Sequence, residues 1–386
     1  MKKEIQLSDH FGYKKLIYFT IPSILMLIVT SIYGVVDGFF ISNFVGKIPF
    51  AAVNFIVPFL MIVGTLGYMF GTGGSALIAK TMGEGDEKKA NEIFSLITCV
   101  TILSGILIAV ISIIFLRPIA TFLGAEGALL DDAVAYGRII LVALPFLMIQ
   151  YAFASFTVTA EKPQFGLYNN IIAGVINIVG DALFLAVFKW GVTGAALATA
   201  IGQIVGGIIS IVYFARKNSS RLRLVKFGWD GKALLKSCTN GSSELMSEIS
   251  MSIVGMLYNV QLLKYAGEIG IAAYGTIMYV NFIFISIFAG YSVGVAPVIS
   301  YHFGAKNHTE LKSLLKKSFA MIISLSVIMF VASKFLATPL AKIYVGYDAE
   351  LFRMTVHAFK IYSFSFLLAV VVTVILLTAN RKKYKY

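Results

Sequence analysis

The segment FSLITCVTILSGILIAVISIIFL, residues 94–116, decides the fold class of this chain. It contains no charged residue. About 20 consecutive apolar residues are enough for an α-helix to cross the hydrocarbon core of a bilayer. The segment therefore predicts a membrane-spanning helix.

Nine further segments have a similar composition, so the sequence predicts an all-α polytopic membrane protein. The ten expected spans lie near residues 17–41, 50–78, 94–116, 138–160, 166–188, 192–215, 243–264, 271–300, 316–338 and 357–379. The longest of them must tilt or extend beyond the bilayer.

The overall composition agrees with this interpretation. Of the 386 residues, 58% are hydrophobic and 13% are charged, and the mean hydropathy is +0.86. Soluble domains are about 45–50% apolar and about 25% charged. These values exclude an ordinary soluble enzyme, and they exclude a disordered chain, which needs low hydrophobicity.

The net charge of +13 points to membrane lipids as partners and not to nucleic acid. Cytoplasmic loops of membrane proteins carry an excess of Lys and Arg. If the N-terminus is cytoplasmic, that side holds 23 of the 32 basic residues, many of them in the segment 216–238. We therefore expect a multi-pass protein of the cell membrane with both termini in the cytoplasm.

An internal repeat relates the two halves of the chain. With a shift of 221 residues, Gly83 aligns with Gly304, and the region 28–91 shows 13 identities in 64 pairs. About 5 would arise by chance in so apolar a chain. Because the repeat unit contains six spans, its copies should have the same orientation, related by an axis along the membrane normal.

The repeat predicts three parts: a six-helix lobe (1–215), a basic cytoplasmic linker (216–238) and an incomplete lobe of four spans (239–386). By the same arithmetic, two spans and about 50 residues are missing from the second copy. The stretch from about Ala369 ends in a basic tail and lacks the polar residues of its counterpart. We expect a truncated or frame-shifted reading frame.

Four polar residues fall in the outer half of the first lobe: Asp37, Asn177, Asp181 and Thr199. An Asp at the centre of a span costs about 2.5–3.5 kcal/mol, so such residues usually face a cavity and mark an ion path. The four-residue spacing of Asn177 and Asp181 places them on one helix face. Their oxygens suit a hard cation such as Na⁺. Alternatively, the carboxylates share one proton, because close like charges favour protonation of one of them.

Other polar residues in the expected spans are weaker candidates for a substrate cavity: Gln150, Gln203, Asn259 and Asn281. Such residues more often form hydrogen bonds between helices. Glu248 is suited to neutralise a cationic substrate, but a solvated position near the membrane surface explains it equally well. The glycines of residues 64–74 indicate close helix packing, because no Lys-Ser follows them as in a phosphate loop.

Several segments resemble the multidrug and toxic compound extrusion (MATE) family of cation-coupled exporters. They are TIPSILMLIVTSIYGVVDGFFI (20–41), GDEKKA (85–90), AEKPQFGLYNNIIAGVINIVGDALF (160–184), GVTGAALATAIGQ (191–203), NGSSELMSEISMSIVGMLYN (240–259) and AAYGTIMYVNFIFISIFAGYSVGVAPVISYHFGAKN (272–307). The resemblance covers residues 10–368. It implies two six-helix lobes around a central cavity, with Na⁺ or H⁺ taken up by the first-lobe cluster of Asp37, Asn177, Asp181 and Thr199.

We therefore expect a secondary antiporter, without an enzymatic activity or a cofactor, that exports small amphipathic or cationic compounds. One alternative is a lipid-linked sugar or lipid flippase, but that would need Arg or Lys in the cavity, and the mid-span residues here are Asp, Asn and Gln. The other alternative is a non-transporting remnant. The sequence predicts no oligomeric state.

Overall fold

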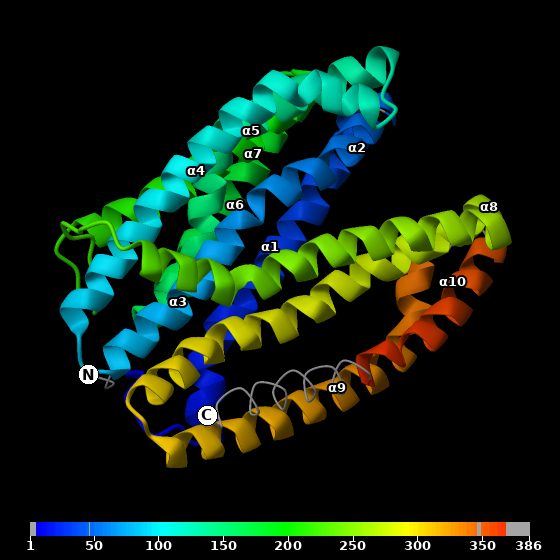
Figure 1. Cartoon of the computed structure of the whole chain (residues 1–386). Coiled ribbons are helices and arrows are strands. Elements are labelled where there is room, and N and C mark those ends of the chain that lie inside the picture. The colour runs from blue at the N-terminus through cyan, green and yellow to red at the C-terminus, as the bar shows by residue number, and fades with distance from the viewer. Residues whose placement is uncertain (1–4, 46, 346–348, 368–386) are drawn as a thin grey trace. The chain divides into compact units, whose positions relative to one another are not determined.

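A computed structural model describes residues 5–45, 47–345 and 349–367, and all regular secondary structure in these ranges is helical (Figure 1). The helices are α1 (Tyr13–Phe44), α2 (Lys47–Gly64), α3 (Leu66–Gly83), α4 (Glu87–Phe122), α5 (Gly127–Thr159), α6 (Pro163–Asp181), α7 (Gly191–Ala215), α8 (Gly231–Gly304), α9 (His308–Val345) and α10 (Ala349–Tyr362). A π-helical segment, Ala182–Val187, follows α6.

The described residues contain eight helical stretches that are long and apolar enough to cross a membrane. They confirm a multi-pass membrane protein. The expected span 50–78 corresponds to α2 and α3 together, which join at Thr65. The expected span 243–264 is not among the eight, and residues 368–379 of the last expected span lie outside the described residues. The arrangement of six plus four spans therefore stays a prediction.

The contacts divide the chain into two compact units. The first comprises Met1–Ser252 and Ala289–His308, and the second comprises Ile253–Phe288 and Thr309–Tyr386. In the first unit α5 is central, because it packs against α2, α3, α4 and α7, while α6 packs against α1 and α7. Four buried phenylalanines form edge-to-face and tilted contacts at this core: Phe94, Phe153, Phe156 and Phe214.

Glycines allow α3 and α5 to approach each other closely. A methyl group built on Gly67 would lie 2.6 Å from the carbonyl oxygen of Met148, and one on Gly71 would lie 2.6 Å from the Cα of Ala152. No side chain larger than hydrogen fits at such separations. The expectation that the glycines of residues 64–74 serve helix packing is confirmed.

Both ends of α8 lie against α3. A methyl group on Gly73 would be 1.9 Å from the carbonyl oxygen of Ser237, and one on Gly83 would be 1.9 Å from that of Tyr301. A straight helix from residue 237 to 301 would measure about 96 Å, whereas the whole of α3 measures about 27 Å. The helical chain of α8 therefore reverses direction between its two ends, which places two segments of it beside α3.

The second unit has a core of its own. Ala273, Ala341 and Leu351 form one buried cluster, and Ile277, Ala337 and Phe359 form another. These residues come from α8, α9 and α10, respectively, so the three helices pack together. The division into lobes at 215 and 239 stays a prediction.

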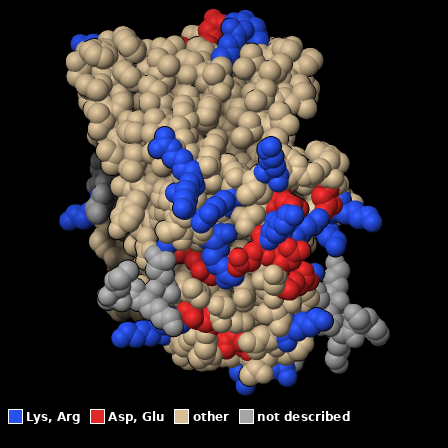
Figure 2. All heavy atoms as spheres, turned by 90° about the vertical axis from the view of Figure 1, so that its left-hand side faces the viewer, with Lys and Arg blue, Asp and Glu red and all other residues tan. Residues whose placement is uncertain are grey.

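Charged side chains gather on one part of the surface, where Lys and Arg are mixed with Asp and Glu, and an adjoining area carries hardly any charge (Figure 2). The segment 217–230, which has no helix, brings several ion pairs to the first unit. Lys89 lies 2.8 Å from Asp230, and Arg221 pairs with both Glu87 and Glu161. The linker is thus fixed to helices of the first unit by charge pairs.

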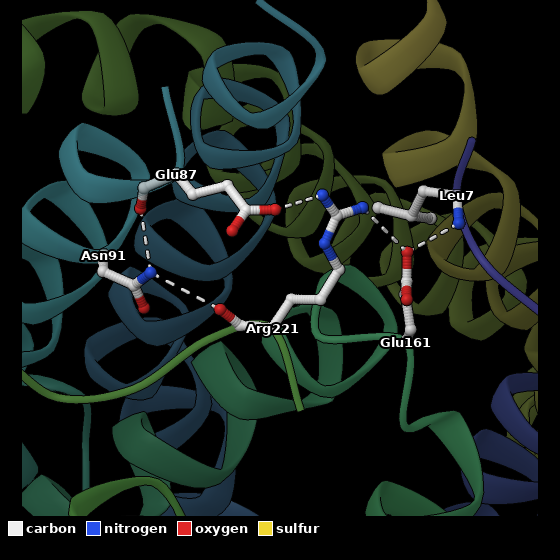
Figure 3. A network of polar contacts seen from close by, with 5 residues as sticks. All are labelled: Leu7, Glu87, Asn91, Glu161 and Arg221. Atoms are coloured by element: carbon white, nitrogen blue, oxygen red, sulfur yellow. Dashed lines mark hydrogen bonds and ion pairs between the residues drawn. The ribbon is translucent and has the colours of Figure 1, made fainter. Parts of the chain in front are cut away.

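Arg221 is the centre of this network (Figure 3). Its guanidinium donates to Glu87 and, at 3.3 Å, to Glu161, which also accepts a 2.7 Å hydrogen bond from the backbone N–H of Leu7. The carbonyl oxygen of Arg221 accepts from Asn91, whose own side-chain oxygen accepts from the N–H of Arg223. One arginine therefore connects the N-terminal segment, the start of α4, the turn between α5 and α6, and the linker.

Candidate cation site

The structure brings together the four residues that the sequence singles out. Asp37 comes from α1, Asn177 and Asp181 come from α6, and Thr199 comes from α7. The Nδ2 of Asn177 donates to the Oγ1 of Thr199 at 3.2 Å. The carboxyl group of Asp37 interacts with both Asp181 and Thr199. Three helices of the first unit therefore place two carboxyl groups, an amide and a hydroxyl around one point.

Asp181 and Asn177 of this cluster are buried, Asp37 and Thr199 are partly buried, and four acceptor atoms of the cluster lack hydrogen-bond partners within the described chain. Asp181 is 0% exposed and Asn177 is 4% exposed. Both carboxylate oxygens of Asp181, one of Asp37 and the amide oxygen of Asn177 have no hydrogen-bond donor among the described residues. Unpaired buried charge is costly unless a cation or a proton compensates it. The site therefore has the chemistry of a receptor for one small cation.

Small residues let α6 and α7 approach at this site. A methyl group on Gly180 would lie 2.9 Å from the side chain of Ala198, and one on Gly202 would lie 2.8 Å from the carbonyl oxygen of Ala173. Directly after Asp181 the chain widens into the π-helical segment, in which the N–H of Phe188 donates to Leu183. Short π-helical segments are rare and often occur at functional sites.

Two tyrosines belong to this environment although sequence reasoning did not select them. Tyr136 of α5 is 3% exposed and interacts with Asp37, Asp181 and Thr199. Tyr33 lies one helical turn before Asp37 and interacts with it. A single buried tyrosine in an apolar span looks like core packing in a sequence, so no signal separated these two from the other 17 tyrosines of the chain.

Gln150 connects two helices. Its amide group donates to the carbonyl oxygens of Gly202 and Gln203, at 3.3 and 3.2 Å. The side-chain oxygen of Gln203 is buried and has no donor among the described residues. Gln150 thus makes the interhelical hydrogen bonds that are the commoner role of such residues.

The remaining substrate candidates fall in two places: Glu248 lies near two tyrosines of the first unit, and Asn281 lies in the second unit. Glu248 interacts with Tyr68 and Tyr151, whose rings stack at 4.0 Å. Asn281 belongs to the second unit, where it is 6% exposed and contacts the sulfur of Met278. The side chain of Asn259 lies outside the described residues.

A small cavity of about 40 Å³ lies within the first unit. The residues that line it include Thr30, Tyr68, Gln150, Tyr151 and Asn170. A buried water needs roughly 10–15 Å³ of such volume, so the cavity has room for a few water molecules. Sites for drug-sized ligands are about 300–1,000 Å³, so this conformation offers no such volume here.

The described residues contain no group of three or more His, Cys, Asp and Glu side chains that would hold a transition metal. The oxygen-only cluster instead suits a hard cation. This cluster is separate from the linker network. Every ion pair of that network lies near the start of α4 or the turn between α5 and α6, whereas the cluster lies at the end of α6 and on α7.

A scan against protein-family models matches the MatE model to residues 22–183 and 245–381. The chain belongs to the MatE family. The resemblance to MATE exporters is thereby confirmed, and it extends to residue 381, past residue 368, where we expected it to end. MATE proteins are transporters, in line with the expectation of a non-enzymatic protein.

Among curated proteins, the chain is 29% identical to the multidrug export protein MepA of Staphylococcus haemolyticus over 321 residues, which is 83% of this chain and 70% of that protein. It is 27% identical to MepA of Staphylococcus aureus over the same shares. Among solved structures, a MATE in complex with MaL6 has a TM-score of 0.89 at 20% identity, with 96% of this chain and 83% of that chain covered. An outward-facing multidrug resistance MATE transporter has a TM-score of 0.88 at 20% identity, with 96% and 82% covered. At this identity the structural likeness concerns the fold.

Proposed function

We propose that this MatE-family chain is a secondary antiporter that exports small amphipathic or cationic compounds in exchange for Na⁺ or H⁺. The multidrug export proteins named among its relatives support the direction and the class of substrate. The single observation that carries the coupling part is the pair of Asp37 and Asp181: one carboxylate oxygen of Asp37 and both of Asp181 are buried and have no donor among the described residues.

The proposed coupling follows from electrostatics. Two buried carboxylates at close range repel each other, and a bound cation or proton removes that repulsion. Asn177 and Thr199 supply neutral oxygens that complete the coordination of Na⁺, whereas a proton needs only the carboxylate pair. An ion that binds one access state more tightly than the other shifts the equilibrium between the states, and a substrate with the opposite preference is thereby exported.

We further place the protein in the cell membrane with both termini in the cytoplasm. The basic residues of the linker support this orientation, because Lys and Arg accumulate on the cytoplasmic side. Membrane lipids and the exported compounds are then its partners. In this orientation the linker network lies at the cytoplasmic face, and the carboxylate pair lies in the outer half of the first lobe.

Efflux of ethidium from cells that express this chain tests the proposal. We expect efflux by the unaltered chain and its loss in Asp181→Asn at equal membrane abundance. An imposed Na⁺ gradient that drives efflux identifies Na⁺, and a pH gradient that drives it without Na⁺ identifies H⁺. The neutral amide of the variant keeps the volume of the side chain but removes its charge.

Asp131→Asn is the matched control, because its carboxylate is exposed and pairs with Arg117. It removes the same charge from a surface position, so efflux should be unchanged. Equal efflux by Asp181→Asn and the unaltered chain contradicts the coupling role. No efflux from the unaltered chain, despite good abundance, contradicts export of this class of compound.

A further inference from the structure

The linker lies against the first turns of α4. The backbone N–H of Arg223 donates to the side-chain oxygen of Asn91 at 2.6 Å. The backbone N–H of Val225 donates to the hydroxyl of Ser95 at 2.8 Å. Because Asn91 and Ser95 are four residues apart on α4, they share one helix face. Two hydrogen bonds thus fix this part of the linker along α4.

This contact lies beside the part of α4 that is exposed and apolar. Beyond Ser95, the first large apolar side chain that α4 exposes is Leu103, and further exposed ones follow as far as Phe115. At 1.5 Å per residue, Leu103 lies about 12 Å along the helix from Ser95. Lipid chains cover such a face on a membrane-spanning helix, and the head groups lie beyond its end. The linker therefore lies near the head-group region, and in Figure 2 Lys and Arg side chains line the border of the nearly uncharged area.

The linker exposes apolar side chains at this level. Val225, Phe227 and Trp229 are exposed, and Trp229 is the most exposed of them at 75%. In an extended segment such alternate positions share one face. In water an exposed Trp leaves a large apolar surface uncovered, whereas the interface of a bilayer suits both its ring and its N–H. The aromatic residues therefore indicate contact with a bilayer surface.

The same part of the chain carries positive charge. Residues 216–236 contain seven basic residues and one acidic residue, Asp230. The carboxylate of Asp230 already pairs with Lys89. Three basic side chains are exposed and form no ion pair with a carboxylate among the described residues: Lys226, Lys232 and Lys236. Their charge is therefore available to a partner outside the described chain.

We propose that Lys226, Phe227, Trp229, Lys232 and Lys236 form a binding surface for anionic phospholipids, which we call the linker surface. Clusters of basic residues beside a membrane-spanning helix attract anionic head groups, and each Lys contributes to the binding. The aromatic rings lie among the head groups, as such rings do at membrane interfaces. An acidic soluble protein also complements the charge, but the continuity with the lipid-covered face of α4 favours lipid. The inference goes beyond the proposed antiport and needs only the placement of the chain in a membrane.

Quenching of tryptophan fluorescence by brominated lipids tests the linker surface. The chain has two tryptophans, so Trp190→Phe makes Trp229 the only emitter. The full chain is placed in nanodiscs of phosphatidylcholine and phosphatidylglycerol in a fixed ratio, with bromine on the acyl chains of one lipid or of the other. We expect both lipids to quench Trp229. Phosphatidylglycerol should be enriched there about tenfold over its share of the bilayer, because its charge complements the three lysines.

The combined variant Lys226→Gln, Lys232→Gln and Lys236→Gln removes the charge and keeps the aromatic residues. The enrichment of phosphatidylglycerol should fall to about 1- to 2-fold, while quenching by brominated phosphatidylcholine persists. Enrichment that stays tenfold in this variant overturns the inference, because the lysines then do not select the lipid.

The matched control removes three charges from exposed positions outside the linker, with the changes Arg138→Gln, Lys312→Gln and Lys316→Gln. It alters the net charge of the chain equally and should leave the enrichment at Trp229 unchanged. A fall equal to that of the linker variant overturns the inference, because net charge alone then attracts the lipid.

Two further outcomes also overturn the inference. Emission of Trp229 that neither brominated lipid quenches means that the linker surface faces water or an acidic protein. Quenching in proportion to the bulk ratio means that the surface contacts lipid without selecting anionic head groups. If Trp190→Phe does not fold, the difference in emission between the unaltered chain and Trp229→Phe gives the signal of Trp229.

The fluorescence measurement does not depend on transport. A chain that exports no dye but enriches phosphatidylglycerol at Trp229 would contradict the proposed function and retain the linker surface. A chain that exports dye without this enrichment would contradict the linker surface alone.

Discussion

The first unit contains two polar clusters, the linker network around Arg221 and the candidate cation site around Asp181. Both contain carboxylates, but these differ in their hydrogen-bond and ionic partners. In the linker network, Glu161 has a 9% exposed side chain, a backbone donor from Leu7 and an ionic partner in Arg221. In the cation site, Asp181 is 0% exposed and neither of its oxygens has a donor among the described residues. Both carboxylates are shielded from solvent, yet only that of Glu161 has a partner among the described residues.

This difference distinguishes an acidic residue that is paired within the described chain from one that is not. A carboxylate that is paired with arginine contributes to holding the fold, because removal of either partner leaves a buried charge. A carboxylate that lacks a partner costs stability and persists when an exchangeable ion supplies the compensation. Substitutions in the two clusters should therefore have opposite effects on stability and on transport.

The largest effect should come from Asp37→Asn. We expect dye efflux to fall by at least about tenfold, which corresponds to about 1.4 kcal/mol of lost coupling. Because the variant removes one of two close negative charges, its melting temperature in detergent should stay the same or rise. Efflux assays at matched abundance and thermal melting of the purified protein measure the two quantities. A lower melting temperature would indicate that Asp37 is structural.

Arg221→Ala should show the reverse pattern. It leaves Glu161 without its cation and removes a charge-assisted hydrogen bond, which is worth about 1.5–3 kcal/mol. The melting temperature should fall, and a second change, Glu161→Gln, should restore part of it because no buried charge remains. Arg223→Ala is the control, since that side chain donates to a backbone carbonyl, that of Asn218, at an exposed position. Equal melting of both arginine variants would contradict the central role of Arg221.

Much of the arrangement of the candidate cation site was predictable from the sequence, and for physical reasons. The spacing of Asn177 and Asp181 fixes one helix face, and the depth of Asp37 and Thr199 in their spans predicts that both lie in the outer half of the first lobe. Tyr136 was not predictable, because its hydroxyl becomes significant only once α5 packs against α7 and brings it near Thr199, Asp37 and Asp181. Burial of an aromatic ring is expected in any apolar helix, so it carries no signal.

The fold was predictable at the level of spans but not of contacts between them. The repeat shows that Gly83 and Gly304 are equivalent, but equivalence does not indicate that they meet. Their contact depends on the reversal within α8, which brings residues 237 and 301 to the same helix. Gln150 was likewise ambiguous, because an amide in a span serves equally well for a ligand or for a neighbouring helix.

The pH dependence of stability shows whether burial of Glu161 or its pairing with Arg221 has the larger effect on the stability of the fold. Burial raises the pKa of Glu161 above the ordinary value of 4.5, although the Leu7 N–H and Arg221 lower it. Because the pKa of Glu161 is higher in the folded than in the unfolded protein, the protonated side chain contributes to the free energy of unfolding. That contribution is present below pH 4.5 and is lost as the pH rises through the raised pKa. The melting temperature of the unaltered protein relative to Glu161→Gln should therefore fall with rising pH. A difference that grows with pH would mean that the pairing with Arg221 dominates.

Asp230→Asn provides the opposite sign as a control. The hydrogen bond from Lys89 lowers the pKa of Asp230 below its ordinary value of 3.8. The ionised carboxylate of Asp230 therefore contributes to the free energy of unfolding above pH 3.8, and this contribution is lost as the pH falls through the lowered pKa. The unaltered protein should therefore lose stability relative to Asp230→Asn in acid. The two variants together assign each part of the pH profile to one carboxylate.

The smallest effect should come from Gln150→Ala, which tests whether a polar residue beside the cavity binds substrate or joins helices. Hydrogen bonds between membrane helices are worth about 0.6 kcal/mol on average, so a slight fall in melting temperature and an unchanged range of exported dyes are expected. A methyl group on Gly206 would lie 1.8 Å from the amide nitrogen of Gln150. Gly206→Ala should therefore destabilise the protein, and Gln150→Ala should relieve that loss in the double variant. A changed range of dyes without this relief would instead make Gln150 a substrate contact.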